Sequence, residues 1–122
     1  MSESILDSYL EQVLETITSY VSELNEKEGG FETKILTGGL SGEYIVFLKK
    51  TNVREVEKIG WLGGKKTKKV REHEPVMSIA YSTHTSDVCI FYDPKWEGKA
   101  KSLEQRFEKR LGKNPKLIEK QL

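Results

Sequence analysis

The chain has 122 residues, of which 36% are hydrophobic and 32% are charged, and its formal net charge is +1. This length suits one domain, and the apolar content is enough for a modest core, which excludes global disorder. The small net charge hides an asymmetry: residues 1–28 hold seven acids and one base, residues 49–71 nine bases and two acids, and residues 95–122 nine bases and four acids. We therefore expect a bipolar surface potential.

Signals for export or for a membrane are missing from the sequence. Cys89 is the single cysteine, so no intrachain disulfide can form. The first thirty residues are acidic and lack an uninterrupted apolar stretch, so we expect no secretory signal. No run of about 18 apolar residues occurs, so we expect no contact with a membrane. The expected location is a reducing compartment, the cytoplasm.

The first segment predicts an amphipathic helix. Ser4 and Asp7 have the spacing of a capping box, and Gly29 and Gly30 are typical of a helix end. Between them, apolar residues recur at steps of three and four: Ile5, Leu6, Leu10, Val13, Leu14, Ile17, Tyr20, Val21 and Leu24. We expect the apolar face to lie on the core and the acidic face to lie in water.

Two short strands are predicted next. The first runs from Phe31 to Leu36, and the glycine-rich stretch 38–42 reads as a turn. The second, Tyr44–Leu48, is apolar on both faces and is expected to end at Lys49 and Lys50. A strand that is apolar on both faces is usually central in its sheet or covered by helices.

The middle of the chain predicts a hairpin followed by two more strands. Residues 52–62 have a helical spacing of valines, but their β-branched content and Gly60 favour a strand over about 54–62. Residues 63–69 are expected to form the hairpin tip, and a return strand from Val70 is expected to be interrupted at Pro75. Strands over 76–81 and 88–92 follow, joined by a polar turn over 82–87.

A second helix is predicted from about Lys95 to Leu111, with Gly112 as its C-cap. The basic residues 113–122 are expected to form a loose tail, either helical or frayed. This order predicts one α+β domain over residues 1–122. It would have an N-terminal helix, an antiparallel meander of about five strands and a C-terminal helix, with both helices on one sheet face.

The lysine-rich hairpin is the most suggestive functional feature. A basic hairpin can follow a phosphate backbone, and a neighbouring aromatic ring can stack on a base. The residues expected to make these contacts are Trp61, Lys65, Lys66, Lys68, Lys69 and Arg71. The competing interpretation is a solvated loop, because charge runs are usually solvated faces.

The last helix supports the same function with its basic outer face, in which Arg106 and Arg110 are the expected contacts. Its charges would add to those of the hairpin if the two lay on the same side. The acidic first helix would have to face away from any phosphate. It equally suits pairing between copies of the chain or docking of a basic partner.

The remaining candidates for binding or chemistry are weaker. The glycine-rich turn leads into a strand, whereas a phosphate-cradling loop leads into a helix. His73 and His84 have no recognised ligand spacing with Glu74, Asp87 or Cys89, so we expect no metal and no cofactor.

Cys89 lies among apolar residues and is expected to be buried as a small hydrophobe. A nucleophilic pair with His84 would instead need an exposed, activated thiol. The order of Asp87, Glu97 and Lys99 is similar to that of metal-dependent nucleases. Glu97 and Lys99 are expected in a helix, however, which makes the order coincidental.

The sequence favours a small accessory protein that binds nucleic acid with little sequence specificity and without catalysis. The alternative is a protein-interaction module, or a homodimeric subunit of a larger assembly. That alternative rests on Tyr44–Leu48, since two helices in so small a domain can leave one apolar sheet face for a partner.

Overall fold

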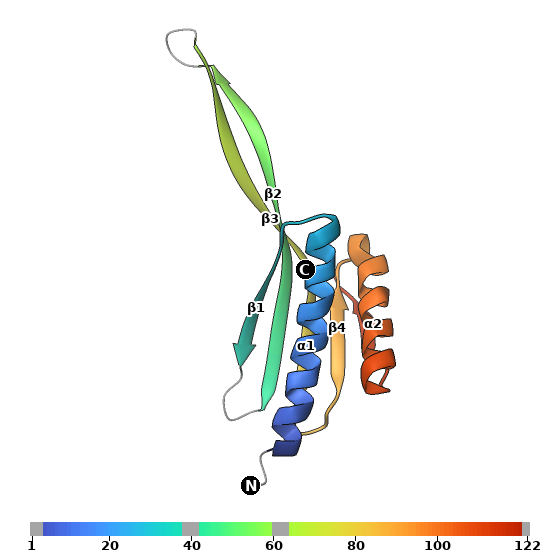
Figure 1. Cartoon of the computed structure of the whole chain (residues 1–122). Coiled ribbons are helices and arrows are strands. Elements are labelled where there is room, and N and C mark those ends of the chain that lie inside the picture. The colour runs from blue at the N-terminus through green and yellow to red at the C-terminus, as the bar shows by residue number, and fades with distance from the viewer. Residues whose placement is uncertain (1–3, 38–41, 60–63, 121–122) are drawn as a thin grey trace.

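The computed structural model describes residues 4–37, 42–59 and 64–120 (Figure 1). Its elements confirm a small α+β fold, with one helix before the first strand and another before the last strand. They are, in chain order, α1 (Ser4–Lys27), β1 (Phe31–Thr37), β2 (Glu43–Ile59), β3 (Lys65–Ser82), β4 (Val88–Tyr92), the 3-10 turn η2 (Pro94–Trp96), α2 (Glu97–Leu111) and β5 (Lys116–Glu119). The turn predicted over 38–42 falls almost wholly outside the described residues.

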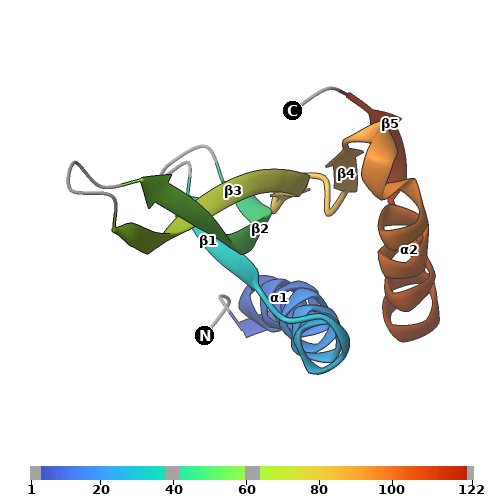
Figure 2. The ribbon, with the colours of Figure 1, turned by 90° about the horizontal axis from the view of Figure 1, so that it is seen from above.

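One five-stranded sheet, in the order β1-β2-β3-β4-β5, forms one layer of the domain, and the two helices form the other. The first four strands are antiparallel, and β5 runs parallel to β4. Figure 2 shows α1 and α2 on the same side of this sheet, as the sequence predicted. None of the described helices is long and apolar enough to cross a membrane.

The first helix is held to the sheet by its C-terminal end. Gly29 and Gly30 have φ of +75° and +85°, and a Cβ at Gly30 would lie 2.6 Å from the carbonyl oxygen of Thr51. The Asn25 side chain accepts a hydrogen bond from the Phe31 amide at 2.8 Å and donates one to the Phe31 carbonyl at 3.1 Å. The chain therefore reverses at the two glycines and enters β1 directly.

Strands β2 and β3 are much longer than predicted, because separate predicted pieces join. Every residue of β2 has a partner in β3, from Glu43 opposite Ser82 to Ile59 opposite Lys65. The prediction that Lys49 and Lys50 end a strand is therefore wrong, as is the placement of Lys65–Lys69 in the hairpin tip. Lysine does not stop a strand whose backbone groups are paired and whose side chains reach water.

Pro75 does not interrupt β3, contrary to the prediction. The register shifts there: Leu48 pairs with Met77 and Lys49 with Pro75, which leaves Val76 as an extra residue in a β-bulge. The Val76 carbonyl accepts a hydrogen bond from Asp93 N at 3.4 Å. Proline has no N–H to donate, and bulges are among the few sheet positions that tolerate it.

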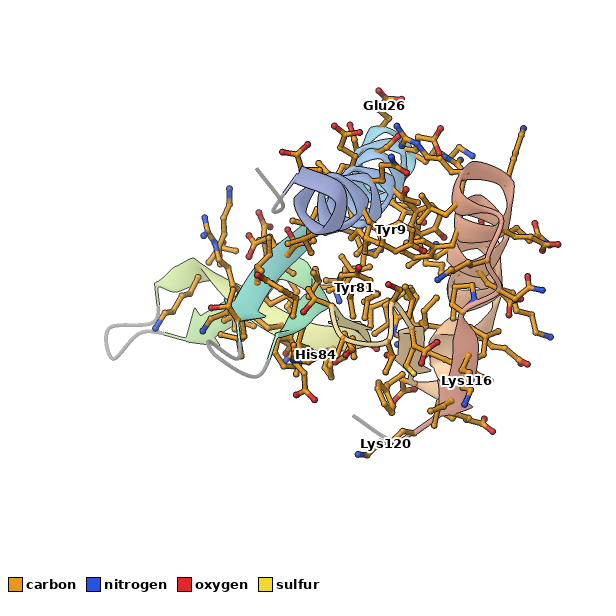
Figure 3. All side chains as sticks on the ribbon, turned by 90° about the horizontal axis from the view of Figure 1, so that it is seen from below. Tyr9, Glu26, Tyr81, His84, Lys116 and Lys120 are labelled. Atoms are coloured by element: carbon orange, nitrogen blue, oxygen red, sulfur yellow. The ribbon has the colours of Figure 1, made fainter. Side chains whose placement is uncertain are left out.

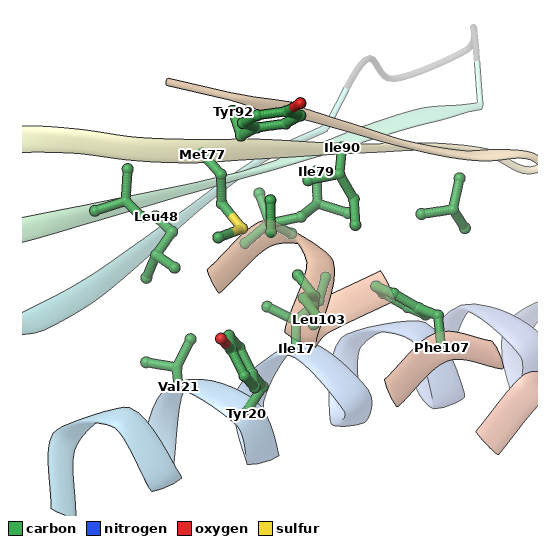
Figure 4. Packing of buried hydrophobic residues seen from close by; sticks show 14 of the residues in the cluster. Ile17, Tyr20, Val21, Leu48, Met77, Ile79, Ile90, Tyr92, Leu103 and Phe107 are labelled. Carbon is green, nitrogen blue, oxygen red and sulfur yellow. The ribbon is translucent and has the colours of Figure 1, made fainter. Parts of the chain in front are cut away.

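The core lies between the helices and the inner face of the sheet (Figure 4). Its fully buried side chains come from all parts of the fold and include Val13, Ile17, Leu48, Met77, Ile79, Ile90, Leu103 and Phe107. Near the start of α1, the rings of Tyr9 and Tyr81 lie between helix and sheet with centroids 5.6 Å apart (Figure 3). The apolar face predicted for the first helix is buried here, at Val13, Ile17, Tyr20, Val21 and Leu24.

The predicted loose tail is wrong, because residues 116–119 form β5. Pro115 is buried, Leu117 packs on the core, and Lys120 N donates a hydrogen bond of 2.9 Å to the Tyr92 carbonyl. Helix α2 is the crossover that a parallel pair of strands requires. Such a four-residue strand has no strong local signal, since its stability comes from β4 and the core.

Leu117→Ala should lower the free energy of unfolding by about 1–3 kcal/mol, because a partly buried leucine loses its contacts with the core. Urea unfolding monitored by circular dichroism measures the change. Glu119→Ala, an exposed position in the same strand, is the matched control and should change stability by less than about 0.5 kcal/mol. Equal effects of both variants would contradict a docked β5.

Candidate nucleic-acid interface

The most prominent surface feature is a two-stranded arm that projects from the sheet (Figure 1). We define the arm as residues 52–59 of β2 and 65–73 of β3. The last hydrogen bond from β2 towards β1 is donated by Thr51 N to the Gly30 carbonyl at 2.8 Å, and β4 pairs with β3 only from Met77 onward. Eight paired residues extend the arm by about 26 Å.

The arm is strongly basic. It carries three acids, Glu55, Glu57 and Glu72, against seven bases, which gives it a net charge of +4. The bases are Arg54, Lys58, Lys65, Lys66, Lys68, Lys69 and Arg71. Lys68, Lys69 and Arg71 are exposed, and none of them forms an ion pair with a described residue.

Of the sequence-predicted contacts on the hairpin, Trp61 lies outside the described residues. The structure places the backbones of Lys65 and Lys66 in β3, next to the end of the arm. The lysine run therefore follows one strand of a ladder rather than a turn. Along the backbone, the positions of Lys66 and Lys68 on one face are about 6.6 Å apart, and those of Lys65 and Lys69 on the other face about 13 Å apart.

The end of the arm combines like charges across the ladder. Lys58 is directly opposite Lys66, and Lys68 is opposite Val56 in the neighbouring pair. The nearest acid on this side of the ladder, Glu72, is held by Arg54 at 2.7 Å. Lys68 lies on this side, is exposed and has no acid directly opposite it, so its charge is available to a bound anion.

The second predicted contact surface, on α2, is neutralised by α1. Arg106 pairs with Glu23, and Arg110 pairs with Glu15 at 3.6 Å. Helix α2, which carries both arginines, lies beside α1 in the body of the domain, away from the end of the arm (Figure 1). The structure therefore does not bring Arg106 and Arg110 together with the hairpin lysines.

A basic aromatic cluster at the base of the arm was missed by the sequence reasoning. The Nζ atoms of Lys50, Lys95 and Lys99 lie 5.8, 5.5 and 5.7 Å from the centre of the Trp96 ring. They come from β2, η2 and α2, so no continuous stretch of sequence reveals the cluster. The ring borders a pocket of about 500 Å³, which Lys27 and Lys99 also line.

Two carboxylates partly neutralise this cluster. Glu28 accepts hydrogen bonds from Lys99 at 2.5 Å and from Lys50 at 3.4 Å, and Glu74 pairs with Lys95 at 2.5 Å. Three bases thus face two acids. The hydrogen bond from Lys99, followed by the charges of Lys99 and Lys50, lowers the pKa of the Glu28 carboxyl below its ordinary value.

The remaining sequence candidates do not come together. Asp87 and Glu97 lie beyond opposite ends of β4, a strand about 16 Å long, and Lys99 is engaged with Glu28. Over residues 4–37, 42–59 and 64–120, no group of three or more His, Cys, Asp or Glu side chains is placed to hold a metal ion. Cys89 is half-exposed, so the prediction of a buried cysteine is wrong.

The two histidines lie on separate elements. His73 is exposed on the arm, with its Nδ1 atom 3.0 Å from the Thr51 hydroxyl. His84 lies in the turn before β4.

No protein-family model matches this chain, and no curated protein or solved structure does either. The functional argument therefore rests on the geometry and charge described above.

Glu28→Gln should lower the free energy of unfolding at pH 7 by up to about 1 kcal/mol, since the ion pairs are partly exposed. A pKa that is lowered in the folded state stabilises the fold above its ordinary value of 4.5. That contribution is lost as the pH falls through the folded-state pKa, so the variant and the wild type should converge in acid. Urea unfolding at a series of pH values tests this.

The matched control is Glu26→Gln, because Glu26 is exposed and points away from the body of the protein (Figure 3). It should cost little and show no convergence with pH. A pH-independent loss in Glu28→Gln would contradict the proposed charge interaction.

Proposed function

We propose that this protein binds nucleic acid with little sequence preference, through the basic arm. The observation that carries the proposal is the outer half of the arm, where the exposed Lys68, Lys69 and Arg71 form no ion pair with a described residue. A phosphate backbone supplies the anionic charge that would stabilise this arrangement. Lysines contact phosphates as point charges, which positions a nucleic acid without reading its bases.

The shape of the arm supports the same function. A two-stranded ribbon fits the major groove of DNA, which is about 12 Å wide, and can equally lie along a single strand. In this proposal Lys65, Lys66, Lys68, Lys69 and Arg71 contact phosphates, and Trp61 stacks on a base. No catalysis and no cofactor are part of the proposal, and a reducing compartment such as the cytoplasm suits the free thiol of Cys89.

Within this proposal, the bases near the C-terminal helix that contact nucleic acid differ from the two arginines that the sequence predicted. Arg106 and Arg110 are already paired with Glu23 and Glu15, so binding through them would first require breaking those contacts. Lys95 and Lys99 are also paired, with Glu74 and Glu28, but together with Lys50 they make three bases against two acids, which leaves one positive charge beside Trp96 at the base of the arm. For this reason we assign these two lysines to the interface.

Replacing Lys65, Lys66, Lys68 and Lys69 together with alanine should weaken binding of short DNA and RNA at least about 100-fold at low salt, because about four phosphate contacts are lost. Fluorescence anisotropy at about 50 and 200 mM salt measures both affinity and salt dependence. Wild-type affinity should fall several hundred-fold between these conditions if about five phosphates are contacted. The variant should show a much shallower slope.

The matched control is Arg106→Gln with Arg110→Gln, which removes two positive charges from α2 and leaves the arm intact. This control should bind within about threefold of the wild type, since neither arginine contacts phosphate in the proposal. Absence of wild-type binding at low salt, or equal losses in the two variants, would refute the arm as the interface.

A further inference from the structure

The face of the sheet that points away from α1 and α2 is apolar. We call it the outer face and define it by Leu36, Ile45, Phe47, Ser78, Ala80, Cys89, Phe91 and Ile118. No described helix or strand covers it (Figure 2). Leu36, Phe47 and Ile118 are 44%, 38% and 38% exposed, which is unusual for large apolar side chains clustered on a sheet.

Large and small side chains form a regular pattern on the outer face. The register gives two parallel rows, Lys34–Phe47–Ser78–Phe91 and Leu36–Ile45–Ala80–Cys89. In both rows the residue on β3 is small and its neighbour on β2 is large. Strand β3 therefore forms a groove beside a ridge of Ile45 and Phe47, and an apolar hollow of about 430 Å³ continues this groove next to Pro75.

Charge and area both favour a protein partner on this face. The centre formed by β2, β3 and β4 is uncharged in both rows, and charged residues border it at Lys34, at Lys116 and at Lys49, which pairs with Glu32. Four strands over about six residues span about 400 Å² in projection on each copy, or about 800 Å² for a pair, which suits a weak and reversible dimer.

We propose that a second copy of this chain covers the outer face, related by a twofold axis that runs parallel to the strands between β2 and β3. This axis places the ridge on β2 of each copy over the groove on β3 of the other. Phe47 then faces Ser78 of the second copy, and Ile45 faces Ala80. Large side chains meet small ones in both rows, as two interdigitating sheets require.

The alternative axis, perpendicular to the strands, fits less well. It would place ridge on ridge, with Ile45 and Phe47 of both copies in conflict. The axis along the strands also brings Leu36 over Cys89 of the second copy and lets the aliphatic part of Lys34 lie on Phe91. The large side chains of this face fit the small side chains of an identical face. This is the reason to assign the face to a second copy rather than to a different protein.

This arrangement has a consequence for the arms. Rotation about an axis along the strands keeps the strand direction, so both arms project from the same end of the dimer. Two arms on one ligand would raise its apparent affinity through effective concentration. The dimer itself depends on the sheet face alone and stands whether or not the arm binds nucleic acid.

Sedimentation equilibrium of the full chain should show a monomer–dimer equilibrium, with a dissociation constant of roughly micromolar order for an interface of this size. Phe47→Glu should raise that constant at least about 100-fold, because it buries two unpaired carboxylates. Ile35→Glu is the matched control, since Ile35 is 50% exposed on β1 but pairs with the buried Val46 and so lies on the other face of the sheet. It should leave dimerisation unchanged.

A wild-type chain that stays monomeric to several hundred micromolar would overturn the proposal. A dimer that is equally stable in Phe47→Glu would assign the contact to another surface and would overturn it too. Circular dichroism of each variant shows whether its fold is retained. If Phe47→Glu fails to fold, the crosslinking experiment below decides the question.

Leu36→Cys tests the axis itself. Leu36 and Cys89 are three strands apart within one chain, about 14 Å, but face each other across the proposed dimer. A short thiol–thiol crosslinker should therefore convert Leu36→Cys largely to covalent dimer, at a rate that rises with protein concentration. Ile35→Cys, on the other face of the same strand, is the control and should yield little dimer. Equal yields from both variants would contradict this axis.

Discussion

The long ladder between β2 and β3 is the constraint on which the rest of the structure depends. Within the body, its side chains form the core with both helices. Beyond Thr51 and Pro75 the same ladder continues without a third strand and becomes the arm. An isolated two-stranded hairpin is marginally stable in water, so the arm owes its order to the body in which its strands are rooted. The bulge at Val76 lies at this junction.

Contacts between the helices decide which of the charged segments remains available. The acidic side chains of α1 lie beside the basic ones of α2, and Glu15, Glu23 and Glu28 each hold a base from that helix. The acidic N-terminal segment and the basic C-terminal segment therefore partly cancel in the fold. The arm has no such counterpart among the described elements, and its excess charge is left for a partner.

The one-sided arrangement of the helices has a second consequence. A domain of two layers buries only one face of its sheet, and here the other face is also apolar. The same ladder thus presents two surfaces of opposite chemistry: a charged arm suited to an anion, and a grooved apolar sheet suited to another protein surface. Their separation in space allows each to act without the other.

Much of the fold follows from local pattern. The three- and four-residue spacing of apolar side chains gave both helices, and Gly29, Gly30 and Gly112 marked their ends. Short apolar runs bounded by turn residues gave β1, β4 and the inner part of β2. The sequence also showed that the lysine run belongs to a hairpin. It failed where a short-range signal was outweighed by pairing: lysines did not end β2, Pro75 did not break β3, and residues 116–119 joined β4 instead of fraying.

The sequence by itself determined the α+β class, the helices and the segmental distribution of charge, since each depends on residues close together in the chain. Only the tertiary structure decided that α2 is neutralised, that Lys50, Lys95 and Lys99 surround Trp96, and that the outer face is bare. These features arise from contacts between distant segments, such as the pair Glu23 and Arg106, which are 83 residues apart. Electrostatics and burial depend on distance in space, which composition and spacing do not specify.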